Sequence, residues 1–230
     1  MMFRSACREA LGAPALAMAA TFLAFGAAVQ AAGLGLGWGL AAALLVYGMP
    51  GQMVLVTAVT LPGGAASLAV GPAVLGAATA NARFLPMAVA LSPWLGGGAR
   101  RWWGLPFIAV TPWAMAMRRL PGLPEASRLA WFLGFGLTSW LVAGAATLLG
   151  HAMAPLVEGP LLALLLFVNP LYFALILTGE MRAIASRRAV ICGCCAAPLV
   201  LFLPAGWALL AAGLLGGTLA FLWGERHGRR

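Results

Sequence analysis

The chain has 230 residues, of which 63% are hydrophobic and only 8% charged, whereas a soluble domain has about 25% charged residues. It is therefore predicted to be an integral membrane protein. Its formal net charge of +9 comes entirely from arginine, and we interpret it as a signal that orients the chain toward the cytoplasm and anionic lipid, not as a nucleic-acid surface.

Eight apolar stretches are candidates for membrane-spanning helices, since one crossing takes about 20 residues. The fourth stretch is the weak candidate, because as a helix it would rise only about 20 Å against a hydrocarbon core of about 30 Å, although Trp102, Trp103 and Leu120 could extend it. The fold class predicted is all-α, a polytopic membrane helical bundle of 7–8 transmembrane helices in a single domain over residues 1–230. The stretches are 12–34, 37–60, 72–95, 105–117, 129–149, 160–178, 189–203 and 207–223.

Residues 1–31 admit a second interpretation. Arg4 and Arg8 precede an apolar stretch that ends at Val29-Gln30-Ala31, which is the arrangement of a secretory signal peptide and its cleavage site. Because the stretch is long enough to span a membrane, we expect it to be kept as the first helix.

Loop arginines predict which ends of the spans face the cytoplasm. Arginines occur in 118–128, 182–188 and 226–230 but not in 150–160 or 204–206, so the last four spans have one consistent orientation. Upstream, eight crossings place Arg4 and Arg8 inside but leave Arg100 and Arg101 outside. Seven crossings, with a re-entrant fourth stretch, do the reverse. We favour eight.

The second stretch contains a break. Tyr47-Gly-Met-Pro-Gly-Gln52 places two glycines, a proline and an amide in an apolar run. Pro50 has no N–H to donate to the carbonyl of Val46, and Gly48 and Gly51 leave the backbone uncovered. In lipid, such a break is tolerated only where protein or a wet cavity satisfies the freed groups. We predict that it lines a substrate site.

A second interruption is expected at Asn169-Pro170, within the stretch 160–178. Broken helices at corresponding places in two halves of a chain are typical of a transporter site built from structural repeats. The alternative is that these prolines are simply tolerated in membrane helices, and that Asn169 marks an ordinary turn.

Asn81 and Arg83 lie near the expected bilayer centre. An arginine there costs about 2.5–3.5 kcal/mol on insertion scales, so a partner must offset that cost. Pro86 is expected to leave the carbonyl of Ala82 without its helical donor, which would place a free carbonyl beside a guanidinium. Such a pair could hold a zwitterion.

Each of these residues also has a structural interpretation. Arg83 could lie nearer an interface and extend to the headgroups, and Gln52 and Asn81 could be polar contacts between helices, worth about 0.6 kcal/mol. Tyr47 could be an aromatic wall or an interface anchor. These alternatives stay open at the level of sequence.

Residues for catalysis or for a cofactor are not grouped. The chain has no aspartate and only two histidines, His151 and His227, which stand apart. Cys192, Cys194 and Cys195 could hold a soft metal, but no histidine or carboxylate stands near them. We therefore predict no enzyme activity, no cofactor and no metal site.

With these residues in place, the chain resembles the AzlC family of azaleucine-resistance type, a subunit of branched-chain amino acid exporters. Three stretches carry the resemblance. Tyr47-Gly-Met-Pro-Gly-Gln-Met53 is similar to a Tyr/Phe-Ala-Gly-Ser-Ala-Gln-Phe element, and Asn81-Ala-Arg-Phe-Leu-Pro-Met87 is similar to Asn-Leu-Arg-His-Leu-Leu-Tyr. The third comprises 131–140 and the region 167–188.

The resemblance implies a single transporter domain in a bacterial cytoplasmic membrane that exports hydrophobic, branched-chain amino acids. It also implies a small AzlD-like membrane partner. Phe84, Met87 and Met49-Pro50 depart from the family pattern, and no acid stands near Thr111 where the family tends to carry one. We therefore expect membership more firmly than an identical substrate or proton coupling.

The substrate-binding residues predicted from both lines of argument come from the two breaks and the Asn81 segment: Tyr47, Gly48, Pro50, Gly51, Gln52, Asn81, Arg83 and Asn169. Two other functional classes remain as alternatives. One is a membrane assembly subunit that transports nothing, and the other is a membrane-embedded enzyme that modifies a lipid.

Overall fold

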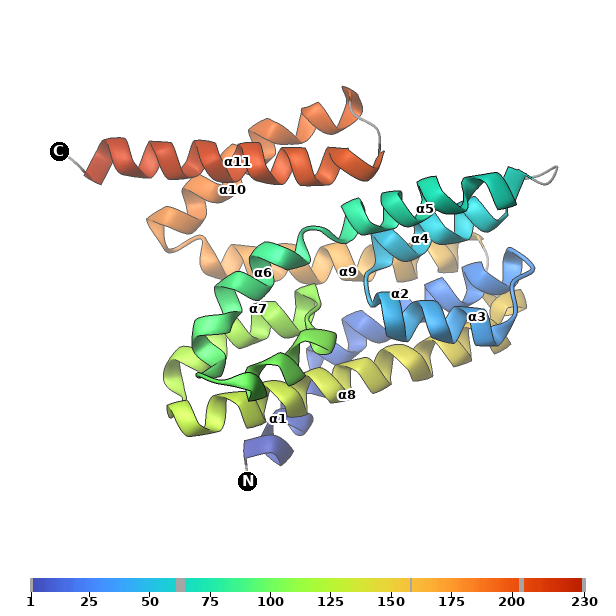
Figure 1. Ribbon diagram of the computed structural model, residues 1–230, viewed down its shortest axis with the longest axis horizontal. Helices are drawn as coiled ribbons and strands as arrows, with labels where there is room; N and C mark the ends of the chain where they lie inside the picture. Colours follow the sequence, from blue (N-terminus) through green and yellow to red (C-terminus); the bar gives the residue numbers. More distant parts are fainter. Residues whose placement is uncertain (1, 61–64, 158, 203–204, 229–230) are drawn as a thin grey trace.

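The computed structural model describes residues 2–60, 65–157, 159–202 and 205–228, and all elements in these ranges are helical (Figure 1). The expected all-α bundle is confirmed. The helices are α1 (Met2–Ala10), α2 (Ala13–Ala31), α3 (Leu36–Ala41), η1 (Ala42–Val46), α4 (Met49–Val59), α5 (Ala65–Asn81), α6 (Phe84–Leu91), η2 (Ser92–Leu95), η3 (Ala99–Phe107), α7 (Val110–Arg119), η4 (Leu120–Gly122), α8 (Glu125–Ala152), η5 (Ala154–Leu156), α9 (Gly159–Glu180), α10 (Ile184–Ala196), η6 (Ala197–Phe202) and α11 (Ala205–Gly228).

The centre of the bundle is the pair α2 and α8, which contact each other through glycines. A side chain at Gly26 would overlap the carbonyl oxygen of Thr147, and one at Gly150 would overlap that of Leu23. Small residues let membrane helices approach this closely, and van der Waals packing then holds them. Because α2 is packed into the core, the segment that resembles a signal peptide is an integral part of this fold.

The first hairpin, residues 36–59, is the stretch expected to cross the membrane once with a break. Gly39 lies against Val29 and Thr147, and Leu44 lies against Gly144 further back along α8. The chain therefore runs antiparallel to α8 from Leu34, whose carbonyl lies 3.1 Å from His151 Nε2. It reaches the level of Trp140, whose Nε1 donates to the carbonyl of Leu44 at 2.9 Å.

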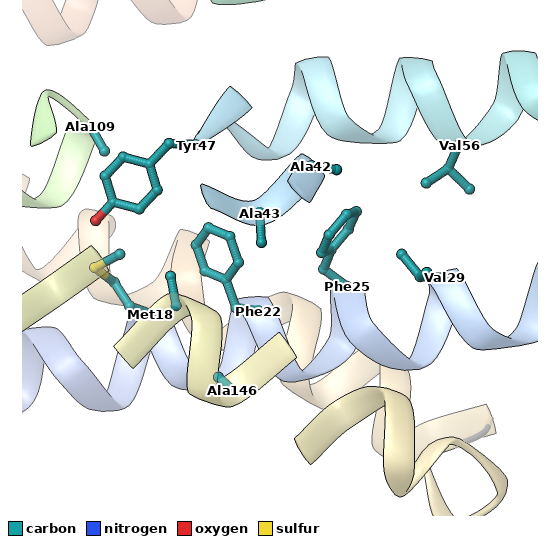
Figure 2. Packing of buried hydrophobic residues seen from close by; sticks show 11 residues of the cluster. Met18, Phe22, Phe25, Val29, Ala42, Ala43, Tyr47, Val56, Ala109 and Ala146 are labelled. Atoms are coloured by element: carbon teal, nitrogen blue, oxygen red, sulfur yellow. The ribbon is translucent and has the colours of Figure 1, made fainter. Parts of the chain in front are cut away.

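After Tyr47 the chain turns back. Figure 2 shows Ala42, Ala43 and Tyr47 running one way along α2 and Val56 of α4 lying back beside Val29. Residues 37–60 thus enter and leave at the same end of the bundle, and the predicted single crossing is wrong. Pro50 does not break a helix. It lies in the first turn of α4, where its missing N–H removes no helical hydrogen bond.

The second hairpin, residues 99–119, enters from the opposite end (Figure 1). Gly104 contacts Phe132 and Phe107 contacts Gly136, so η3 runs along α8 toward the middle of the bundle. The chain reverses at Ile108–Ala109 and returns as α7. Arg128 Nε, at the start of α8, donates to the carbonyl of Leu120 at 3.1 Å. The short fourth stretch is therefore re-entrant, and the eight-crossing topology is not formed.

Helix α9 is continuous from Gly159 to Glu180. The interruption expected at Asn169-Pro170 is absent, because a proline inside a helix removes a single hydrogen bond and the remaining bonds continue on either side. The break that pairs spatially with Tyr47–Gly48 is Ile108–Ala109. The four described helices that are long and apolar enough to cross a membrane are Ala13–Ala31, Gly71–Leu95, Glu125–Ala152 and Gly159–Gly179.

One end of the bundle collects the loop arginines, and we call it the arginine-rich end. The helix ends that carry these loop arginines all lie at this end of the bundle (Figure 1). Arg119 Nε lies 3.5 Å from Glu9 of α1, and Arg188 of α10 lies over Trp223 of α11 at 5.9 Å. With two re-entrant hairpins, Arg4 and Arg100 fall at the same end, which neither the seven- nor the eight-crossing topology allowed. The positive-inside rule is then satisfied by α1, η3, α7, the start of α8 and the α9–α10 turn.

The re-entrant first hairpin predicts a labelling pattern. In a chain without its native cysteines, single cysteines at Gly35 and Thr60 flank the hairpin. We expect a membrane-impermeant maleimide to label both from the same face, because both positions lie at the end opposite the arginine-rich end. A cysteine at Arg182 is the control for the other face. Labelling of Gly35→Cys and Thr60→Cys from opposite faces would contradict the hairpin.

Candidate functional site

Three interruptions of helical structure meet in the middle of the bundle and line a half-open cavity of about 240 Å³. They are Tyr47–Gly48 at the tip of the first hairpin, Ala82–Arg83 between α5 and α6, and Ile108–Ala109 at the tip of the second hairpin. The side chains that line the cavity come from these breaks and from α2 and α9: Met18, Thr21, Phe22, Tyr47, Gly48, Met49, Arg83, Phe84, Ala109, Val110, Thr111, Pro170 and Phe173.

Tyr47 forms the turn of the first hairpin. It ends the π-helix η1 with φ 45° and ψ 32°, a left-handed conformation that is rare for an aromatic residue. Its ring stacks on Phe22 at 6.1 Å and lies between Ala109 and Met18 (Figure 2). The hydroxyl is buried without a hydrogen-bond partner. Strained residues and single-turn π-helices both cluster at functional sites.

The position of the Asn81 side chain explains why residues 48 and 51 are glycines. A Cβ on Gly48 would lie 2.5 Å from Asn81 Oδ1 and 2.9 Å from the ring of Phe84, and a Cβ on Gly51 would lie 2.6 Å from Asn81 Nδ2. The start of α4 therefore packs directly on the end of α5. Asn81 Oδ1 is buried without a partner. The glycines make room for an amide that lies behind the cavity wall.

Gln52 is fully buried and closes the first hairpin from within. Its Nε2 donates to the carbonyl of Ala42 at 3.1 Å, which joins α4 to η1 across the turn. Its Oε1 has no partner, and the side chain does not line the cavity. The hydrogen bond from Gln52 Nε2 to Ala42 favours the interpretation of Gln52 as a polar contact between helices.

Arg83 is the cation of the site. It is the middle residue of the 25-residue apolar segment Gly71–Leu95, and its guanidinium lies 5.4 Å from the Phe84 ring centroid. Nε is buried and has no hydrogen-bond partner. Within the described part of the chain no carboxylate pairs with Arg83, while Glu158 and the Glu180 side chain lie outside it. A central arginine that faces a cavity fits a ligand anion better than extension to the headgroups.

The carbonyl oxygens at the breaks are not free in the way the sequence suggested. The turn at Arg83 tightens, so that the N–H of Leu85 donates to the Ala82 carbonyl at 3.1 Å. The N–H of Gln52 donates to the Gly48 carbonyl at 3.0 Å. Each oxygen keeps one lone pair, so each can still accept a weaker second bond.

The predicted residues thus fall into two groups. Tyr47, Gly48 and Arg83 line the cavity, whereas Pro50, Gly51, Gln52 and Asn81 lie behind it. The Asn169 side chain lies outside the described residues, although its neighbour Pro170 lines the cavity. Sequence reasoning missed Met18, Phe22 and Phe173, for which an apolar helix gives no signal. Thr21, a polar residue in the first span, was a usable signal.

The cysteines do not gather at this site. Cys192 is buried, Cys194 and Cys195 are exposed, and Cys7 Sγ lies 3.5 Å from the carbonyl oxygen of Gly134. Among the described residues no group of three histidine, cysteine or acidic side chains is placed to hold a metal.

Comparison with known protein families shows which family the chain belongs to. The sequence model described as "AzlC protein" matches residues 14–157, which is more than half of the chain. The chain belongs to the AzlC family. AzlC proteins are membrane transport components, and the match runs from α2 to the end of η5, so it includes both hairpins and the Arg83 break. No curated protein and no solved structure matches the chain.

The predicted AzlC membership is confirmed, and the first two motifs and 131–140 lie within the matched residues. The match ends before 167–188, so the resemblance of that region stays a prediction. Together with four long apolar helices, the family identifies a multi-pass membrane protein with a role in transport.

Proposed function

We propose that this AzlC protein exports small hydrophobic amino acids, of the branched-chain type, from a bacterial cytoplasm. The observation that carries the proposal is the buried, unpartnered Nε of Arg83 in a mostly apolar cavity between two re-entrant hairpins. A cation in the middle of a long apolar segment, with no carboxylate of the described residues beside it, is suited to a carboxylate that arrives with the substrate.

The cavity supplies a complementary group for each part of such a substrate. Arg83 binds the carboxylate, helped by the positive amino end of α4 at Gly48. The ammonium meets oxygen acceptors in the Tyr47 hydroxyl and Thr111. The apolar side chain lies among Met18 and Met49 together with the aromatic rings of Phe22, Phe84 and Phe173. The volume of about 240 Å³ is below the usual range of about 300–1,000 Å³ for larger ligands.

Two further observations support an orientation and a partner for the chain. By the positive-inside rule the arginine-rich end faces the cytoplasm. Helix α9 buries none of its most apolar window within the described chain, so it has a free face for lipid or for a second membrane subunit. We include in the proposal a small AzlD-like partner that forms a two-component exporter with this chain, which acts as its large subunit and not as an enzyme.

The proposal predicts that Arg83→Gln strongly reduces export. Cells that express the chain with its adjacent small membrane protein are loaded with dipeptides of valine, leucine or methionine, and efflux of the free amino acid is measured. A lost hydrogen bond to a charged group costs about 1.5–3 kcal/mol, so we expect efflux to fall at least about tenfold.

Arg182→Gln is the matched control, since Arg182 is an exposed loop arginine and its loss should leave efflux unchanged. The membrane content of each variant is compared by immunoblot. Normal efflux from Arg83→Gln at equal protein would refute the role of Arg83. Absence of efflux from wild type at normal protein levels would instead refute the substrate class and favour an assembly subunit.

A further inference from the structure

A second cavity, of about 430 Å³, lies at the arginine-rich end, away from the Arg83 site. It is formed by α6, η2 and η3, the elements that lead from the Arg83 break into the second hairpin. Its wall is apolar except for two side chains, Ser92 and Arg101. The volume is within the range of about 300–1,000 Å³ found for ligand sites.

Arg101 is held in place at this cavity. Its Nη1 donates to the hydroxyl of Ser92 at 3.4 Å, and its guanidinium lies 5.0 Å from the ring centroid of Trp102. The Nε atom is buried without a hydrogen-bond partner. No acidic side chain lines the cavity, so the positive charge is not neutralised there by the described protein. The site therefore favours an anion with at least two oxygen acceptors.

The rest of the cavity wall is apolar and indicates that the anion carries an apolar group. Leu85 is 70% exposed, Val89 66% and Trp102 55%, and they line the cavity along the outer surface of the bundle. An apolar wall that leads to a cation beside an exposed tryptophan is the arrangement expected at a membrane interface. A free phosphate would use the cation and leave the apolar wall unused.

We propose that this cavity binds one anionic phospholipid from the leaflet at the arginine-rich end. The phosphate accepts hydrogen bonds from Arg101 and from the Ser92 hydroxyl, and one acyl chain lies along Leu85, Val89 and Leu105. The bound lipid connects α6 to η3 and so supports the second hairpin. This assignment is independent of the substrate proposed for the Arg83 cavity.

The test uses the full chain purified in detergent and native mass spectrometry, with phosphatidylglycerol or phosphatidylcholine added at equal concentration. Wild type is expected to retain phosphatidylglycerol at least tenfold more than phosphatidylcholine. Arg101→Gln should lose this preference, whereas Arg100→Gln should keep it, because Arg100 is an exposed neighbour that does not line the cavity. Equal retention of phosphatidylglycerol by wild type and Arg101→Gln would overturn the proposal.

Two further measurements keep the test decisive if Arg101→Gln fails to fold. Ala88→Phe fills the apolar part of the cavity and leaves Arg101 in place. It should lower the retention of phosphatidylglycerol at least tenfold, and unchanged retention would count against the site. Glycerol 3-phosphate, which has the headgroup charge without acyl chains, should not displace phosphatidylglycerol from wild type. Displacement at equal concentration would show a site for a free phosphate and refute the lipid.

Discussion

Replacement of Gly150 by valine is expected to remove most of the folded protein from the membrane. A Cβ at this position would overlap the carbonyl oxygen of Leu23, which is backbone of the buried helix α2 and cannot move aside like a side chain. Overpacking of a core usually costs about 1–3 kcal/mol, and we expect the upper end or more here. That is a large part of the about 5–15 kcal/mol that keeps a protein folded.

The measurement is the amount of monodisperse protein extracted in detergent and its thermal unfolding temperature. Gly213→Ala is the matched control, since a Cβ on this helical glycine of α11 meets no atom within 4 Å. It should be neutral or stabilise the chain by up to about 1 kcal/mol. If Gly150→Val were as stable as Gly213→Ala, α2 and α8 would not pack as closely as described.

Export is expected to be lost in Gly51→Ala, although the chain still reaches the membrane. The new methyl group would lie 2.6 Å from Asn81 Nδ2, so the Asn81 side chain must rotate or α4 must move away from α5. Either change shifts Tyr47 and Arg83, which line the cavity on the two sides of this contact. We expect efflux to fall at least tenfold. Gly37→Ala is the control, because a Cβ at Gly37 meets no atom within 4 Å, and it should leave efflux unchanged.

A double variant separates the packing of Asn81 from a role in transport. Gly51→Ala with Asn81→Ala removes the amide that the new methyl group meets, so the thermal unfolding temperature should return toward wild type. If Asn81 orients the substrate or Arg83, efflux stays low in this variant. Recovery of efflux together with stability would show that Asn81 is only a packing residue.

The fold could be predicted from sequence as far as its class and the location of its polar interruptions. Composition gives a helical membrane bundle, and the glycines around Pro50 mark a real discontinuity. The direction of the chain after Tyr47 could not be predicted, because α3 and α4 have the same apolar composition whether they continue or fold back. Only contacts made after the turn, such as the return of Val56 to the level of Val29, decide between a crossing and a hairpin.

Proline was a weaker guide than glycine. Pro170 lies within a continuous helix and Pro50 lies at a helix start, whereas Gly48 and Gly51 both mark a close approach to Asn81. Neither Ile108 nor Ala109 is a glycine or a proline, so the two residues at the turn gave no signal of their own. The unresolved conflict between Arg4 and Arg100 was the available sign that the topology needed a second re-entrant segment.

For the candidate site, the sequence indicated Tyr47 and Arg83 but missed Thr21, Thr111 and most of the apolar members. Arg83 stands out because a charge in an apolar run is costly. Met18, Phe22 and Phe173 resemble any lipid-facing or core residue, and their place at the cavity depends on how α2 and α9 are rotated. Rotation of an apolar helix is set by its neighbours, which a single sequence does not contain.

The two hairpins join the rest of the bundle at opposite ends, and both contact Trp140 near their tips. Its Nε1 donates to the carbonyl of Leu44 near the first tip, and its ring meets Phe107 near the second at 6.3 Å. Because one side chain contacts both hairpins, a displacement of Trp140 is expected to act on both tips.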